Sequence, residues 1–186
     1  MLSAGEPWRT TSFAIYGSSL ILLYTASTLY HSLKVSKRAL AALKRFDHIA
    51  IFALIAGTYT PLTLVTLQGD NAAWGWSIFG VAWGFALLGI VFKLLWMSAP
   101  RWLYTGLYLV MGWMAVIAIV PVVQSMPFGG VVWMTLGGLF YTVGALIYAL
   151  KKPDFIPNVF GFHELWHLFV LAGSICHFIM MLKYVL

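Results

Sequence analysis

Residues 131–150 read VVWMTLGGLFYTVGALIYAL, a run of 20 residues without a histidine or a charged side chain. A helix of about 20 residues spans the hydrocarbon core of a membrane, which is about 30 Å thick. The run is continuously apolar and does not alternate, so it indicates a transmembrane helix and not a strand of a β-barrel. The fold therefore depends on how many such segments the chain contains.

Five further apolar segments accompany this one, and together they predict an all-α integral membrane protein with six transmembrane helices. The chain has 186 residues, of which 62% are hydrophobic and 9% are charged. A soluble domain carries about 25% charged residues, so the low charge of this chain excludes a soluble globular protein. We predict one domain over residues 1–186, with spans at about 11–33, 45–67, 74–97, 102–123, 131–150 and 160–184.

Other classes of protein fit the composition poorly. A single cysteine, Cys176, excludes a disulfide scaffold, and the apolar content excludes a disordered or collagen-like chain. The net charge of +6 does not indicate nucleic-acid binding, because the basic residues lie in short gaps between apolar runs. The first eleven residues contain Glu6 and Pro7 and lack an apolar core, so we expect no cleaved signal peptide.

The charge distribution predicts the orientation in the membrane. Nine of the 11 Lys and Arg residues lie in the first, third and fifth connections or at the span ends beside them, and the positive-inside rule places these connections in the cytoplasm. Both ends of this chain are then expected to face outward. We predict a multi-pass protein of the plasma or inner membrane. We expect these loops to contact anionic headgroups, and residues 35–43 form either a short basic helix on the membrane surface or a loop. The nine residues are Lys34, Lys37, Arg38, Lys44, Arg45, Lys93, Arg101, Lys151 and Lys152.

Helix packing and bending also leave signals in the sequence. Gly80 and Gly84 form a small-xxx-small pair that could let the third span approach a neighbour closely. Pro61 and Pro121 are expected to bend the second and fourth spans.

Ionisable side chains gather at the cytoplasmic ends of three predicted spans. His31 lies near the end of the first span and Asp47 near the start of the second, while His163 and His167 lie in the first turns of the last. Such groups are costly in lipid and are candidates for function. Ser27 lies one turn before His31 and shares its helix face.

The spacing of the histidines is typical of a metal site. His163 and His167 are i,i+4, which lets two imidazoles of one helix bind one ion, and His31 could supply a third. Zinc with three histidine ligands keeps a position for water and lowers the pKa of that water to about 7. Asp47 could orient this water or take its proton, and Ser27 could hydrogen-bond the water, a substrate carbonyl or His31.

Each of these residues also has a purely structural interpretation. Histidines near helix ends often sit at the membrane interface. Asp47 could be a carboxylate favoured by a helix N-terminus and paired with Lys44 or Arg45. Ser27 could bond the carbonyl four residues before it.

For the remaining ionisable residues we expect structural positions. His48 follows Asp47 directly, so we expect it to point elsewhere, toward the membrane interface. His177 lies about 15 Å deeper than His167 and is expected to be packed or hydrogen-bonded. Lys93 and Lys183 are expected to extend toward the interface.

Residues 163–167 read HELWH and match the H-E-x-x-H motif of zinc proteases. In that class Glu164 would be the general base and a third ligand would often follow downstream. The only downstream histidine is His177, which a continuous helix carries out of reach. Glu164 could help the water or pair with Lys151 or Lys152.

Three blocks of the sequence together resemble the haemolysin III proteins, the bacterial branch of the progestin and adiponectin receptor (PAQR) family. They are ASTLYHSL with Ser27 and His31, RFDHIAIFALIAGTYTP with Asp47, and GFHELWHLFVLAGS with His163 and His167. The blocks keep the order and spacing of the family, and the resemblance covers essentially the whole chain.

The resemblance implies a seven-helix bundle with a zinc ion near the cytoplasmic side. It implies His31, His163 and His167 as zinc ligands, with Asp47 and Ser27 completing the site through water. The first helix of the family pattern is the one that we do not find in this chain. The wider group includes alkaline ceramidases, and some relatives are linked to ceramide hydrolysis or to control of membrane fluidity.

Three functions follow as hypotheses. The first is a zinc-dependent hydrolase of lipid amide or ester bonds, whose substrate lies within the bundle. The second is a non-enzymatic homeostasis or receptor-like protein with structural zinc. The third is a pore-forming haemolysin, which the sparse polar residues of the third, fourth and fifth spans disfavour. A membrane protease is a further alternative.

Overall fold

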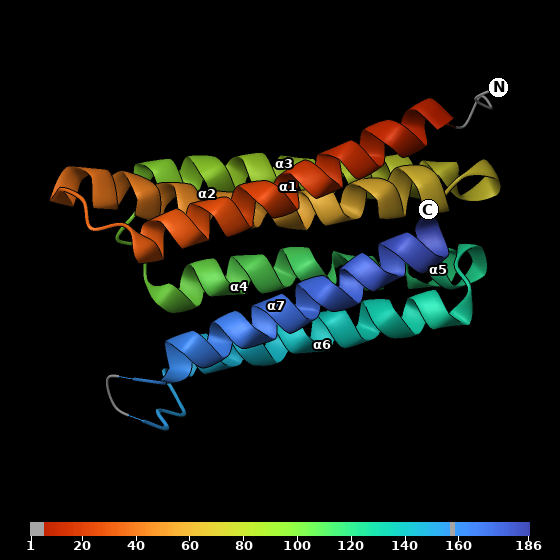
Figure 1. Ribbon diagram of the computed structural model, residues 1–186. Coiled ribbons are helices and arrows are strands. Elements are labelled where there is room, and N and C mark those ends of the chain that lie inside the picture. Colours follow the sequence, from red (N-terminus) through yellow and green to blue (C-terminus); the bar gives the residue numbers. More distant parts are fainter. Residues whose placement is uncertain (1–5, 157–158) are drawn as a thin grey trace. The chain divides into compact units, whose positions relative to one another are not determined.

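The chain is all-α in the computed structural model, which describes residues 6–156 and 159–186 (Figure 1). Five helical segments are long and apolar enough to cross a membrane, and a bent pair of helices makes a sixth if it counts as one span. The chain is therefore an all-α integral membrane protein, as its composition predicts. Its contacts divide it into two compact units, Met1–Ala99 and Pro100–Leu186.

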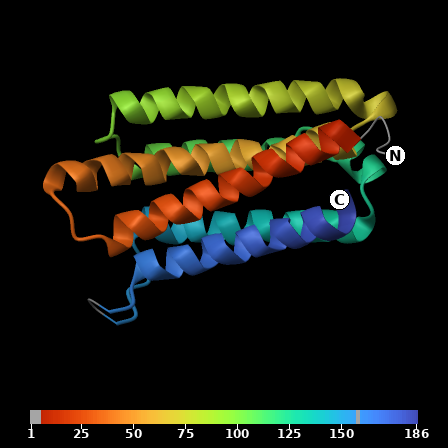
Figure 2. The ribbon, with the colours of Figure 1, turned by 45° about the horizontal axis from the view of Figure 1, so that its top comes forward.

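The first unit contains three long helices that run up and down. They are α1 (Glu6–Ser32), α2 (Lys37–Pro61) and α3 (Ala72–Leu95), with a π-helical turn (Leu62–Thr66) and a 3-10 turn (Gly69–Asn71) after α2. Figure 2 shows α2 lying between α1 and α3, and α2 contacts both. The indole Nε1 of Trp83 on α3 donates to the hydroxyl of Thr60 on α2 at 3.1 Å.

The start of α2 differs from the predicted span, which began at Arg45. The helix begins at Lys37, and the hydroxyl of Ser36 caps it by accepting from the backbone N–H of Ala39 at 3.3 Å. The basic stretch after the cap is therefore helical and continuous with α2. Its alanine and leucine residues are strong helix formers, which explains the extension.

In the first unit, α3 approaches its neighbours closely at glycines other than the predicted Gly80 and Gly84. A methyl group added at either of those glycines would meet nothing within 4 Å. At Gly89 it would meet the ring of Phe52, and at Gly75 it would meet backbone oxygens at 2.6 and 2.7 Å. The predicted pair was wrong because it lies on a different face of α3 from the buried stripe, which is Gly75, Ile78, Ala82, Ala86, Gly89 and Lys93.

The second unit is built on the antiparallel pair α6 and α7. Its elements are α4 (Arg101–Gly112), a 3-10 turn (Trp113–Val116), α5 (Ile119–Ser125), α6 (Phe128–Leu150) and α7 (Phe162–Met180), which continues as a π-helical turn (Met181–Val185). Helix α6 contacts α7 along its length and also contacts α4.

A break separates α4 and α5, as the sequence predicts from Pro121. The segments Arg101–Val116 and Ile119–Ser125 meet at 55°. Proline has no N–H to bond to the carbonyl of Ile117, four residues earlier, and its ring crowds that carbonyl. The break lies one turn before the proline for this reason. At Pro61 the helix continues and widens into the π-helical turn.

Candidate functional site

The first unit brings together Ser27 of α1 and Asp47 of α2. The hydroxyl of Ser27 hydrogen-bonds to the carboxylate of Asp47. Asp47 is 5% exposed, so this bond satisfies a buried acidic group. This contact with a side chain of the neighbouring helix α2 is a partner that the sequence reasoning did not name for Ser27.

Asp47 does not lie at a helix N-terminus, which corrects the alternative that the sequence left open. Because α2 begins at Lys37, Asp47 stands well beyond its first turn and gains little from the helix dipole. His31 lies close enough to Asp47 for their charges to interact. The imidazole of His31 is exposed and packs edge-on against Tyr30, with 4.5 Å between ring centroids.

His48 also belongs to this group, although the sequence placed it at the interface. It is 8% exposed, and its Nδ1 lies 2.8 Å from the carbonyl oxygen of Lys44 and 3.7 Å from Oδ2 of Asp47. A carbonyl can only accept, so Nδ1 carries a proton. His48 follows Lys44 by four residues, and this helical spacing is the feature of the sequence that could have predicted the bond between its ring and the Lys44 carbonyl.

In the second unit His163 and His167 face each other on α7. Their Nε2 atoms are 3.2 Å apart, and both side chains are half-buried. Two nitrogens bound tetrahedrally to one zinc ion at about 2.0–2.1 Å lie about 3.3 Å apart. The observed separation fits that geometry, so these donors suit a metal ion. In the metal-free state one imidazole donates to the other.

Glu164 has a structural role at the start of α7. Its Oε2 accepts a hydrogen bond from the backbone N–H of Gly161 at 2.8 Å, which fixes the first turn. The backbones of Ile156 and Phe160 bond to each other just before this turn. The carboxylate thus holds the helix that carries the histidine pair.

Two other ionisable residues lie within the spans, His177 and Lys93. Nδ1 of His177 donates to the carbonyl oxygen of Gly173 at 2.9 Å, and its ring stacks on Tyr141 with 5.4 Å between centroids. The prediction that His177 is packed and hydrogen-bonded is confirmed. Lys93 is 0% exposed, so the expectation that it extends to the interface was wrong.

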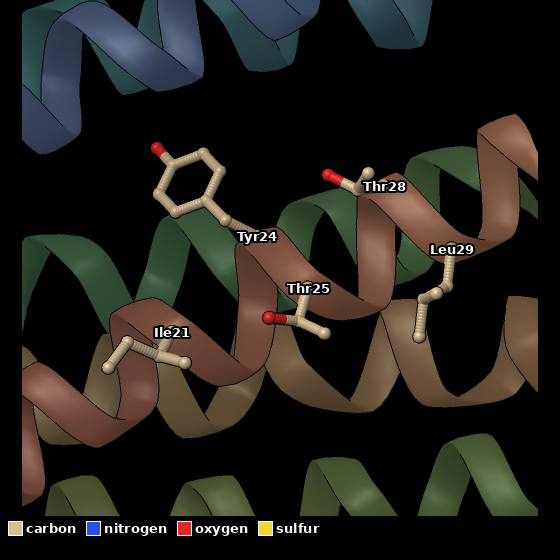
Figure 3. A pocket seen from close by; sticks show the side chains of 5 residues that line it. All are labelled: Ile21, Tyr24, Thr25, Thr28 and Leu29. Carbon is tan, nitrogen blue, oxygen red and sulfur yellow. The ribbon is translucent and has the colours of Figure 1, made fainter.

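A hollow lies on α1, within the first unit. Figure 3 shows the hydroxyls of Tyr24 and Thr28 on the same side of the helix, with Thr25 nearby. Ile21 and Leu29 complete the lining, so the hollow joins hydroxyl groups to apolar side chains.

Comparison with known proteins places this chain among membrane proteins of one family. A family profile described as "Haemolysin-III related" matches residues 1–178. A hemolysin-3 homolog of Bacillus subtilis (strain 168) is 42% identical over 97% of this chain and 80% of the relative. Hemolysin-3 of Bacillus cereus is 39% identical over 98% of this chain and 78% of the relative.

More distant relatives come from eukaryotes. The monocyte to macrophage differentiation factor of Homo sapiens is 26% identical over 95% of this chain and 71% of that protein. No solved structure matches the chain. The profile and the two bacterial relatives cover nearly the whole sequence, including all three blocks on which the resemblance rests. This chain is a multi-pass membrane protein that belongs to the haemolysin-III-related family.

Proposed function

We propose that the chain is a zinc-dependent hydrolase of lipid amide or ester bonds that works at the cytoplasmic face of the membrane. The observation that carries the proposal is the 3.2 Å separation of Nε2 of His163 and Nε2 of His167, which fits two ligands of one zinc ion. His31 is the third proposed ligand, as the resemblance to the family implies.

The topology supports a common site. Helix α1 ends just after His31 and α7 begins just before His163. With alternating spans and the positive-inside rule, both helix ends lie at the cytoplasmic face. Histidines from two separate helices are thus available at the same depth.

The proposed chemistry assigns a proton carrier to the chain itself. When bound, zinc supplies a Lewis acid that polarises the substrate carbonyl. Asp47 takes the proton of the attacking water and returns it to the leaving amine or alcohol oxygen as the C–N or C–O bond breaks. Ser27 donates to the Asp47 carboxylate and so fixes the carboxylate for this transfer.

The lipid partner is proposed from two surfaces of the first unit. The hollow on α1 offers hydroxyl groups and apolar side chains to one chain of a lipid. Exposed basic residues in the connection after α1 and in the first turn of α2 suit anionic headgroups, and they are Lys34, Lys37 and Arg38.

Metal content is the first half of the test. The purified full chain is expected to carry about one zinc ion, measured by mass spectrometry, because three histidines and a water complete a tetrahedral site. His31→Ala and His163→Ala should each lose the ion. His177→Gln is the matched control on α7 and should keep it. Absence of zinc from carefully prepared wild type would overturn the proposal.

Lipid hydrolysis is the second half of the test. The wild type is reconstituted in vesicles of phosphatidylcholine and anionic lipid, with or without ceramide, and product release is measured. Asp47→Ala should be slower by at least about 100-fold, the usual effect of losing a general base. Asp70→Ala, a carboxylate in the turn after α2, should match the wild type. Zinc without any hydrolysis would instead favour the non-enzymatic hypothesis with structural zinc.

A further inference from the structure

An aromatic side chain of α6 lies against the histidine pair of α7. The ring centroid of Tyr148 is 4.6 Å from that of Trp166 and 6.0 Å from that of His163. The ring centroid of Trp166 in turn lies 5.5 Å from that of His163 and 4.5 Å from that of His167. Tyr148 therefore supports both histidines, one directly and one through Trp166.

Tyr148 is itself held at three points by two side chains of α4. Arg101 donates from Nη1 to the carbonyl oxygen of Tyr148 at 3.2 Å, and its guanidinium carbon lies 4.5 Å above the ring. The hydroxyl of Tyr104 lies 3.3 Å from the hydroxyl of Tyr148, within hydrogen-bond distance. Stacking and hydrogen bonding together leave the ring little freedom.

We infer that Tyr148 is a positioning residue for His163 and His167, and that Arg101 fixes Tyr148 for this purpose. The inference rests on the proposed function, in which the two imidazoles bind zinc. Ligands of a metal bind best when neighbouring groups hold their rings in the required orientation before the ion arrives. Tyr148 restricts His163 from the α6 side, and Arg101 restricts Tyr148 from the α4 side.

If Tyr148 only packed α6 against α7, its loss would have the same effect as the loss of another aromatic contact between these helices. The two helices contain such a contact for comparison. Phe140 of α6 packs on Phe169 of α7 with 6.0 Å between centroids. Phe140 precedes Tyr148 by two turns, which places it about 12 Å away along the helix. Loss of either ring removes an aromatic contact between the same two helices, but only Tyr148 touches the histidine pair.

Metal affinity separates the two roles. Zinc affinity of the purified full chain is measured by competition with a chelator, and the absorption spectrum of bound Co²⁺ reports the ligand geometry. Tyr148→Leu should weaken zinc binding by about 10-fold or more and alter the spectrum, the usual size of such an effect. Tyr148→Phe keeps the ring and should stay near the wild type, while Arg101→Gln should weaken binding in the same direction.

The control and a metal-free measurement complete the experiment. Phe140→Leu should keep the zinc affinity and the Co²⁺ spectrum. In metal-free protein labelled on its histidines, Tyr148→Leu should shift the ¹⁵N signals of His163 and His167, whereas Phe140→Leu should not. If Tyr148→Leu shifts these ¹⁵N signals but the wild type binds no zinc, the positioning role of Tyr148 is supported and the proposed function is overturned. Zinc binding that Tyr148→Leu leaves unchanged, or that Phe140→Leu weakens equally, would overturn the positioning role alone.

Discussion

Glu164 occupies the motif position of a protease base, yet its carboxylate bonds to the backbone N–H of Gly161 at 2.8 Å. We expect Glu164→Ala to destabilise the protein by about 1 kcal/mol, as removal of a helix N-terminal cap does. Thermal unfolding of the purified protein measures this loss. Zinc content should stay at the wild-type level, because the histidine ligands remain.

Glu164→Gln is the control for this substitution. Its amide oxygen can accept the same bond from Gly161, so we expect the melting temperature, the zinc content and lipid hydrolysis to stay near those of the wild type. Loss of hydrolysis in a Glu164→Gln variant that melts normally would assign Glu164 to the reaction and contradict the structural role.

Residue-level predictions succeeded where spacing along one helix decides the contact. The i,i+4 relation of His163 and His167 is enough to predict that they face each other, since a helix repeats every 3.6 residues. His48 and Lys93 were misplaced because burial depends on the neighbouring helices. Lys93 lies four residues after Gly89, on the buried stripe of α3, and the uniformly apolar sequence of this helix does not reveal which face is buried.

At the scale of elements, the number of spans follows from apolar length, but the packed face of each helix does not. Helix α3 is so uniformly apolar that its sequence favours no face, and the glycine pair chosen from the sequence lies away from the contact. Pro121 predicted the break before α5 because the cause is local: proline disturbs its own helix. The face that a helix packs against its neighbours depends on residues far away in the sequence, so it could not be predicted in this way.

The approach of α2 and α3 at Gly89 gives a prediction at this scale. An alanine methyl group at Gly89 would meet the ring of Phe52, which is 0% exposed, so the ring would have to shift within the packed interior. We expect Gly89→Ala to destabilise the protein by about 1–3 kcal/mol through overpacking. Thermal unfolding in detergent measures the change.

Gly84→Ala is the matched control on the same helix. Its added methyl group would meet nothing within 4 Å, so its melting temperature should equal or slightly exceed that of the wild type, since alanine favours helix. Equal destabilisation by both substitutions would show that α3 does not pack on α2 through Gly89.

At the scale of the whole molecule, the bent pair of helices α4 and α5 decides the topology. If the pair crosses the membrane as one span, the chain has six spans. Lys151 and Lys152 then face the cytoplasm with the other basic loops, and so does the start of α7. If the pair instead turns back, α6 and α7 are inverted. The histidine pair would then lie on the opposite side of the membrane from His31.

Cysteine accessibility separates these topologies, and a background without its one cysteine is available through Cys176→Ser. Single cysteines are placed at three exposed positions, Lys37, Asp70 and Asp154, and intact cells are treated with a membrane-impermeant maleimide. We expect Asp70→Cys to react in intact cells, and Lys37→Cys and Asp154→Cys only after permeabilisation, because basic loops stay inside. Reaction of Asp154→Cys in intact cells would place the loop before α7 outside. His31 could then not share a metal ion with His163 and His167, and the proposed hydrolase would lose its third ligand.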